Sequence, residues 1–257
     1  MCGQLASDSR KVLFVFVEGV LYMIETPVVA LTGAGISAES GVPTFRGAGG
    51  LWREFRPEDL ATPEAFVRDP KLVWEWYAWR REVVAGCDPN AAHRVLVEME
   101  EQLRRENFTL VTQNIDGLHE AAGSRNVLRL HGSLWSMRCT REGTRNSDRR
   151  VPLEEIPPRC SDCGALLRPD VVWFGETLDR DVLEAAIAAS RRAKMMIVIG
   201  TSAAVQPAAS LPLLAKRNGA RLIEINPDET PLSADADEVL RGPAAVELPR
   251  WWALQAG

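Results

Sequence analysis

Short apolar runs bounded by glycine or polar residues recur along the chain and predict the strands of a buried sheet. They lie at residues 28–31, 108–113, 127–130, 195–202 and 221–226. Runs this apolar are typical of parallel strands covered on both faces. Stretches of helical composition lie between the runs, at residues 90–106, 179–193 and 206–219. Strand and helix alternating in this way predict an α/β fold, a Rossmann-like doubly wound parallel sheet.

The helical stretches carry recognisable end signals. Asn90 follows a proline and is a favourable N-cap, and the second stretch begins with Asp179 or Asp181 as its cap. The third stretch ends at Gly219, a common helix stop. These signals strengthen the assignment of helices between the strands.

Two stretches interrupt the alternation. Residues 42–90 contain no clear strand and are rich in Trp, Arg and Pro, and residues 138–168 hold three of the five cysteines. We therefore expect one Rossmann-like domain over residues 25–257, with a smaller domain inserted at about 42–90 and 138–168. This smaller domain would combine a helical segment with a zinc-ribbon-like module. Residues 1–24 would form an N-terminal extension.

The extension contains an apolar run at residues 12–24 that is only 13 residues long and includes Glu18 and Gly19. Such a run is too short to span a bilayer comfortably. Arg10 and Lys11 precede it, as in a signal peptide, but no small-residue cleavage site follows. We expect an added helix or a loosely ordered extension. A targeting segment remains open, as does an over-long start with Met23 as the natural beginning.

The composition of the chain argues against two classes of protein, nucleic-acid-binding proteins and secreted disulfide-rich proteins. The chain has 257 residues and a formal net charge of -5, which gives no general reason to expect nucleic-acid binding. Its five cysteines are too few and too unevenly placed for a secreted disulfide scaffold. We therefore expect a cytoplasmic protein in a reducing setting, with no membrane association, and a monomer.

The first predicted strand leads into "GAGISA", which fits the dinucleotide fingerprint G-x-G-x-x-A. Gly33 and Gly35 would let the backbone approach a pyrophosphate. A dehydrogenase should then show a second strand and an acidic residue about 20 residues further on. Glu54 stands there, but no strand precedes it, and the loop continues instead into "PTFRG". Half of the dehydrogenase signature is missing, although an ordinary Rossmann oxidoreductase remains an alternative.

Polar side chains follow two other predicted strands. Gln113, Asn114 and Asp116 end one strand, and His131 directly follows another. Ligands bind at this carboxyl edge in open α/β sheets. Asp116 could equally be a helix cap, and His131 could be structural. A histidine in this place could also act as a catalytic base, because its unperturbed pKa lies near neutrality.

Taken together, the motifs resemble one family, the sirtuins, which are NAD-dependent protein-lysine deacylases. The matching motifs occur in the family's order: "GAGISAESGVPTFRG", "TQNIDGLHEAAGS", "LHGSL", a cysteine-bearing insertion, "RPDVVWFGE", "GTSAAVQPAA" and "INPDET". The resemblance covers nearly all of residues 28–250. It implies that acyl-lysine proteins are the substrates and that His131 is the base. The implied products are free lysine, nicotinamide and O-acyl-ADP-ribose.

The resemblance also implies roles for many residues. Phe45 would shield the reacting centre from water. The other residues expected to contact NAD are Gly33, Ala34, Gly35, Ile36, Ser37, Thr44, Arg46, Trp52, Gln113, Asn114, Ile115, Asp116, Gly200, Thr201, Ser202, Asn226, Pro227, Asp228 and Ala244. An extended acyl-lysine peptide would pair with the backbone of Val171, Val172, Trp173, Phe174, Gly175 and Glu176.

Tyr77 and Arg80 are three residues apart in a stretch of helical composition, so they share a helix face. In a purely structural interpretation, Arg80 pairs with a neighbouring acid and the aromatic residues fill a core. In the sirtuins, a Tyr-x-x-Arg pair marks the subclass acting on succinyl and malonyl groups. A guanidinium can hold a carboxylate by two parallel hydrogen bonds, and a phenol can add a third. We therefore expect desuccinylase and demalonylase activity, with weaker deacetylation.

Other functions remain as alternatives: a protein that is mainly a deacetylase, a mono-ADP-ribosyltransferase, or a non-catalytic NAD-binding regulator. The family's structural zinc normally takes two C-x-x-C pairs. Here Cys160 and Cys163 form one pair, but Cys139 stands without its partner and Glu142 occupies the fourth place. Zinc held by three thiolates and Glu142, zinc held by three thiolates and water, and no metal are all open. Cys2 and Cys87 are expected to be free thiols.

Overall fold

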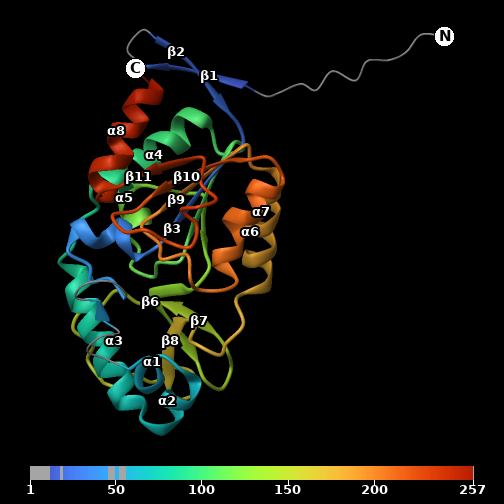
Figure 1. Ribbon diagram of the computed structural model, residues 1–257. Coiled ribbons are helices and arrows are strands. Elements are labelled where there is room, and N and C mark those ends of the chain that lie inside the picture. Colours follow the sequence, from blue (N-terminus) through green and yellow to red (C-terminus); the bar gives the residue numbers. More distant parts are fainter. Residues whose placement is uncertain (1–11, 18–19, 46–49, 52–55, 257) are drawn as a thin grey trace.

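The computed structural model describes residues 12–17, 20–45, 50–51 and 56–256 (Figure 1). Its main sheet has six parallel strands in the order β11-β10-β9-β3-β4-β5. The strands are β3 (Val28–Thr32), β4 (Phe108–Thr112), β5 (Val127–Arg129), β9 (Met195–Ile199), β10 (Arg221–Ile225) and β11 (Glu238–Leu240). The five predicted strands and the parallel doubly wound fold are confirmed. The short edge strand β11 was not predicted.

Helices cover both faces of this sheet, as Figure 1 shows. They are α4 (Ala91–Leu103) and α8 (Ala244–Ala256) on one face, and α6 (Arg180–Arg192) and α7 (Leu211–Arg217) on the other. Successive side chains of β3 point to opposite faces: Val28 and Ala30 pack with α4 and α8, while Val29 and Leu31 pack with α6 and α7. A strand buried on both sides must be apolar at every position.

The predicted helix caps are present. The side chain of Asn90 accepts hydrogen bonds from the amides of Ala92 and His93 at the start of α4. Asp179, rather than Asp181, caps α6 by accepting from two backbone amides of its first turn. Each cap satisfies amides that have no partner within the helix.

The smaller domain lies at the opposite end of the molecule from the C-terminal end of α8 (Figure 1). It combines α1 (Pro57–Leu60), α2 (Pro63–Arg68) and α3 (Pro70–Ala85) with an antiparallel sheet of β6 (Gly132–Cys139), β7 (Arg145–Ser147) and β8 (Leu167–Val171). Trp74 of α3 is fully buried in their common core, and its indole N–H donates to the carbonyl of Leu167 at 2.7 Å. This contact fixes α3 against β8. The short helix α5 (Leu118–Ala122) lies in the chain between β4 and β5.

The N-terminal run forms an antiparallel pair of strands, β1 (Val12–Val17) and β2 (Val20–Glu25), with Val17 opposite Val20. The expectation of an added helix is therefore wrong. The run is rich in Val, Phe and Tyr, which favour strands over helices. In Figure 1 this pair lies beside the C-terminal end of α8. Within the described ranges, no helix is long and apolar enough to cross a membrane.

Candidate active site

A cavity of about 620 Å³ opens at the carboxyl ends of the parallel strands. Strand β3 lies between β4 and β9. The strands that follow β3 first extend the sheet on the β4 side, and the later strands, from β9 on, extend it on the other side. Open α/β sheets bind ligands at such a switch point. The sequence-predicted residues on the cavity wall are Gly33, Ala34, Gly35, Thr44, Phe45, Tyr77, Arg80, Gln113, Asn114, Ile115, His131, the six residues of 171–176, Gly200, Thr201, Ser202, Asn226, Pro227 and Asp228.

Four predicted cofactor residues that the structure describes are not on this wall. Ile36, Ser37, Asp116 and Ala244 are buried behind it. Arg46 and Trp52 lie outside the described residues. The structure therefore brings together residues that follow five strands, β3, β4, β5, β9 and β10, although they are up to about two hundred positions apart in the chain.

The glycine loop lies against the turn that follows β9. The amide of Gly35 donates to the carbonyl of Gly200 at 2.8 Å, and a Cβ on Gly35 would lie 2.7 Å from the Gly200 Cα. Gly200 has a φ of +60°, which favours glycine. No side chain fits between these two backbones. The glycines are therefore required by packing within the protein as well as by any approach to a phosphate.

A polar network supports the loop from below. Asn114 donates to the carbonyl of Gly33 at 3.0 Å, and the Ser37 hydroxyl donates to Asp116 at 2.8 Å. The other carboxylate oxygen of Asp116 accepts from the amide of Leu118 at 2.9 Å. Asp116 thus caps the turn before α5 and also connects the loops that follow β3 and β4.

His131 is held between the parallel sheet and the smaller domain. Its Nδ1 donates to the carbonyl of Gln113 at 2.9 Å, because a carbonyl can only accept. This bond leaves Nε2 as the unprotonated nitrogen of the neutral ring. Burial lowers the pKa of His131, so the ring is neutral at pH 7. A neutral ring with a free Nε2 at the cavity wall can accept a proton.

The backbone around His131 is equally restrained. Its carbonyl accepts from the amide of Val172 at 3.0 Å. The next residue, Gly132, has a φ of +80°, and a Cβ there would lie 2.2 Å from the carbonyl oxygen of Asp170. Only glycine fits this position. The close packing of Gly132 against Asp170 restrains the backbone next to His131 and, with it, the direction of the ring.

Two adjacent arginines on α3 have different environments. The side chain of Arg81 is 1% exposed and pairs with Asp148 at 3.0 Å. The purely structural interpretation, an arginine paired with an acid, therefore describes Arg81. Among the described residues, no carboxylate pairs with Arg80. Its guanidinium carbon lies 4.7 Å from the ring centroid of Phe45 and 5.0 Å from that of Trp76.

Arg80 remains cationic in this setting. Burial lowers its pKa, but an arginine is not deprotonated in a protein. Tyr77 lies beside it on the cavity wall, and burial raises the Tyr77 pKa to about 12, so its hydroxyl keeps its proton. The two side chains offer a positive charge and a hydroxyl donor to whatever enters this part of the cavity.

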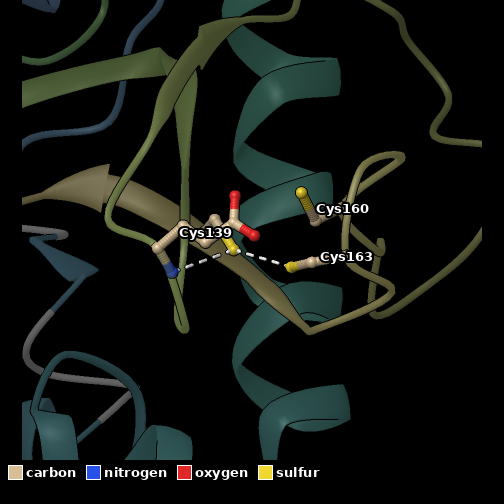
Figure 2. A group of neighbouring side chains, drawn as sticks. Cys139, Cys160 and Cys163 are labelled. Atoms are coloured by element: carbon tan, nitrogen blue, oxygen red, sulfur yellow. Dashed lines mark hydrogen bonds between the residues drawn. The ribbon is translucent and has the colours of Figure 1, made fainter.

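Three cysteines, Cys139, Cys160 and Cys163, lie close together (Figure 2), and Glu142 belongs to the same group. Their ligand atoms all lie within 4.8 Å of one another, and the sulfurs of Cys139 and Cys163 are 3.5 Å apart. Zn–S bonds of about 2.3 Å in a tetrahedron place two sulfurs about 3.8 Å apart. This set of donors therefore fits a structural zinc ion, with the carboxylate of Glu142 as the fourth ligand.

Comparisons with known proteins agree with this geometry. The model of the Sir2 family matches residues 33–207. An NAD-dependent protein deacylase of Aquifex aeolicus is 55% identical over 223 residues, which cover 87% of this chain and 92% of that protein. NAD-dependent protein deacylase 1 of Archaeoglobus fulgidus is 57% identical over 219 residues, covering 84% of this chain and 88% of that protein.

The chain belongs to the Sir2 family. Two solved structures extend the match. The crystal structure of a Sir2 homologue in complex with NAD is 54% identical, with a TM-score of 0.81 and coverage of 90% of each chain. A complex of Sir2 with a p53 peptide and NAD+ is 34% identical, with a TM-score of 0.78 and coverage of 88% of this chain and 92% of that one.

Several cavity residues of this Sir2 family protein were not predicted from its sequence. They are Ala38, Glu39, Ala61, Trp76, Leu178, Val205, Gln206, Glu229 and Thr230. Trp76 could have been found, because it lies four residues before Arg80 and therefore shares its helix face. Ala38 and Glu39 belong to the short 3-10 helix η1 (Ala34–Ser40), and the remaining residues lie in loops and turns whose course the sequence pattern does not give.

The expected peptide-pairing segment, residues 171–176, already uses much of its backbone inside the protein. The amide of Phe174 donates to the carbonyl of Ala61 at 2.9 Å, and the amide of Trp173 donates to Glu176 at 2.9 Å. The amide of Val172 is held by the His131 carbonyl. Two of its carbonyls are also used, because that of Val171 accepts from the guanidinium of Arg168 and that of Trp173 accepts from the amide of Glu176, each at 3.0 Å.

Proposed function

We propose that this Sir2 family enzyme removes succinyl and malonyl groups from lysine side chains of proteins, with acetyl removal as a weaker activity. The observation that carries the proposal is the environment of Arg80. This buried cation faces the cavity beside the Tyr77 hydroxyl, and within the part of the chain that is described no carboxylate forms an ion pair with it, although the carboxylate of Asp116 favours its charge from a greater distance. An acyl group that ends in a carboxylate would supply the missing anion.

The expected preference follows from the strength of charged hydrogen bonds. Each contributes roughly 1.5–3 kcal/mol, and a guanidinium can make two to one carboxylate. At about 1.4 kcal/mol per tenfold, two such bonds support a preference of a hundredfold or more. An acetyl group would leave Arg80 among the rings of Phe45, Trp76 and Tyr77, where it already lies. Deacetylation is therefore expected to continue, but slowly.

NAD would supply the ADP-ribosyl group that takes up the acyl group as nicotinamide leaves. The loops at Gly33–Gly35 and Gly200–Ser202 would hold its phosphates and ribose, and residues 226–228 its adenosine. The free Nε2 of His131 would take a proton from a ribose hydroxyl, and the carbonyl of Gln113 would keep the ring in the required tautomer. Phe45 would exclude water from the reacting centre.

The substrate would be an extended peptide segment carrying the acylated lysine, lying along residues 171–176. Backbone pairing demands little of the side chains around that lysine, which suits an enzyme with several protein substrates. We place the activity in a reducing, cytoplasmic setting, because zinc binding by Cys139, Cys160 and Cys163 requires free thiolates. We expect the enzyme to act as a monomer.

The proposal is tested by Arg80→Met and Tyr77→Phe, assayed with succinyl-lysine and acetyl-lysine versions of one peptide. Both variants are expected to lose desuccinylation by tenfold or more, about 1.4 kcal/mol, and to keep most of the deacetylation. Glu82→Gln is the matched control, because Glu82 is an exposed charge on the same helix. Equal losses on the two peptides would overturn the proposed preference.

A further inference from the structure

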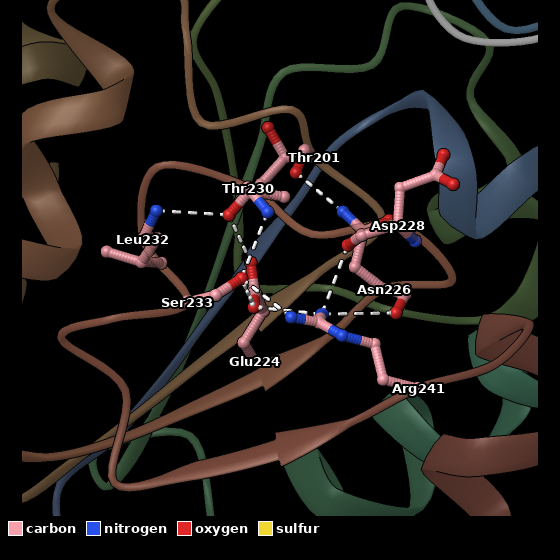
Figure 3. A network of polar contacts seen from close by, with 8 residues as sticks. All are labelled: Thr201, Glu224, Asn226, Asp228, Thr230, Leu232, Ser233 and Arg241. Atoms are coloured by element: carbon pink, nitrogen blue, oxygen red, sulfur yellow. Dashed lines mark hydrogen bonds and ion pairs between the residues drawn. The ribbon is translucent and has the colours of Figure 1, made fainter.

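Glu224 is a buried carboxylate close to the cavity but not on its wall. It lies on β10, is 1% exposed, and accepts hydrogen bonds from the hydroxyls of Thr230 and Ser233 (Figure 3). It also pairs with Arg241 at 3.1 Å. A buried charge is tolerated only when it is paired and hydrogen-bonded, and Glu224 meets both conditions.

Arg241 follows β11 and connects Glu224 to the neighbouring loop. Its Nη1 donates to the carbonyls of Asp228 at 3.0 Å and Asn226 at 3.4 Å, and its Nη2 donates to the Ser233 hydroxyl at 2.8 Å. Figure 3 shows the guanidinium between the Glu224 carboxylate and this loop. One side chain therefore holds three points of the segment that follows β10.

That segment forms part of the cavity wall. Asn226, Asp228 and Thr230 line the cavity, whereas Glu224 and Arg241 do not. Asn226 also donates to the carbonyl of Thr201 at 2.8 Å, which joins the loop to the turn after β9. The network thus sets the position of the wall at which the adenosine of NAD is expected.

We propose that Glu224 and Arg241 are positioning residues for the adenosine end of NAD. They act through the loop at residues 226–230, whose backbone they hold in one conformation before NAD binds. Ordering a loop on binding costs conformational entropy, so a loop that is ordered in advance gives higher affinity. This proposal rests on NAD binding by the Sir2 fold and does not depend on the acyl preference.

The proposal predicts a loss confined to NAD. Replacing Arg241 by Met should raise the KM for NAD and the Kd of ADP-ribose by about tenfold, the effect of losing one charged hydrogen bond. The kcat and the KM for the acyl-peptide should stay unchanged, because His131 and the acyl pocket are untouched. A purely structural role would instead lower the melting temperature and the active fraction, without changing the affinity of the folded enzyme for NAD.

Three further variants separate these roles. Arg241→Lys should recover part of the affinity, because lysine keeps the charge but not the fork of donors. The double variant Glu224→Gln/Arg241→Met removes both charges, so it should fold better than Arg241→Met and still bind ADP-ribose weakly. Arg221→Met is the matched control: Arg221 joins the same two strands through Glu238, without touching the loop.

The experiment is calorimetric titration of each purified variant with ADP-ribose, together with kcat and KM for NAD and for the acyl-peptide. Weakened ADP-ribose binding with normal kcat in Arg241→Met and in the double variant, and normal binding in Arg221→Met, would support the positioning role. Unchanged ADP-ribose affinity in the double variant would overturn it. Equal loss of affinity in Arg221→Met would also overturn it, because the effect would then be general to this sheet edge.

Discussion

The indole N–H of Trp173 donates a hydrogen bond to the hydroxyl oxygen of Tyr77, across 2.9 Å. Trp173 is itself fixed, because its ring centroid lies 5.4 Å from that of Phe66 and 3.5 Å from the guanidinium carbon of Arg168. Since the Tyr77 oxygen already accepts from Trp173, its own proton is free to point elsewhere. In the proposed function, this proton is donated to the carboxylate of the acyl group.

This relationship predicts a selective effect of Trp173→Phe. The ring and its packing are largely kept, but the N–H that orients Tyr77 is lost. We expect desuccinylation to fall by about tenfold, the effect of one weakened charged hydrogen bond, and deacetylation to stay nearly constant. The measurement is kcat/KM on matched succinyl and acetyl peptides.

The double variant Trp173→Phe/Tyr77→Phe serves as the control. Because both changes remove the same hydrogen bond to the substrate, the double variant should be little worse than Tyr77→Phe alone. Additive losses would show that Trp173 acts on the reaction by another route.

The pH dependence of the reaction should reflect His131. The base works in its neutral form, and burial lowers its pKa below the ordinary value of about 6.5. Activity should therefore be near its plateau at neutral pH and decline only as the pH falls through this lowered pKa. A profile of kcat/KM against pH measures this limb. An acid limb above about pH 7 would contradict the described environment of His131.

Zinc content should depend on the three cysteines and Glu142. We expect one zinc ion per chain by elemental analysis, and loss of zinc in Cys160→Ser. Glu142→Cys should bind zinc more tightly, because it restores a set of four thiolates, which suits this borderline-soft ion. Glu142→Ala should bind zinc more weakly in a competition with a chromophoric chelator. Equal zinc affinity in the Ala variant and the unmodified protein would exclude Glu142 as a ligand.

Acid should destabilise the fold through two buried histidines. Burial, together with the neighbouring ring of His119, lowers the pKa of His93 to about 3, and burial lowers that of His119 to about 4. In the unfolded chain both titrate near pH 6.5. Because the folded values are depressed, stability is complete above about pH 6.5 and falls as the pH decreases toward about 4.

The slope is about 1.4 kcal/mol per pH unit for each histidine within that window. Carboxylates whose pKa is lowered, such as Glu176, add to the loss only at still lower pH. Denaturant unfolding followed by tryptophan fluorescence between about pH 7 and about pH 5 measures the effect. A free energy of unfolding that stays constant over this range would show that the two rings are protonated in the folded protein.

Local patterns were enough to predict five of the six strands of the central sheet. Strands β3 and β9 are buried on both faces, so their sequences are apolar apart from Thr32 and could be recognised without knowledge of their neighbours. The N-terminal run was assigned to the wrong structure, because a short apolar run of this kind fits either a helix or paired strands. Its pairing in a two-stranded unit depends on the arrangement of two segments, which a window of residues does not show.

The sequence alone could predict those site residues that belong to a recognisable motif. His131 and the glycine loop stand at strand ends, and the fold places those ends together. The difference between Arg80 and Arg81 could not be predicted, because the partner that separates them, Asp148, lies 67 positions along the chain. The same holds for Glu224 and Arg241, which are brought together only by the pairing of β10 with β11.

The acyl preference can be measured on the unmodified enzyme. One peptide carrying acetyl-, malonyl- or succinyl-lysine is incubated with NAD, and the products are read by mass spectrometry. We expect malonyl and succinyl groups to be removed with a kcat/KM about a hundredfold above that for acetyl, with one nicotinamide released per lysine freed. Faster removal of acetyl than of either acidic group would contradict this expectation.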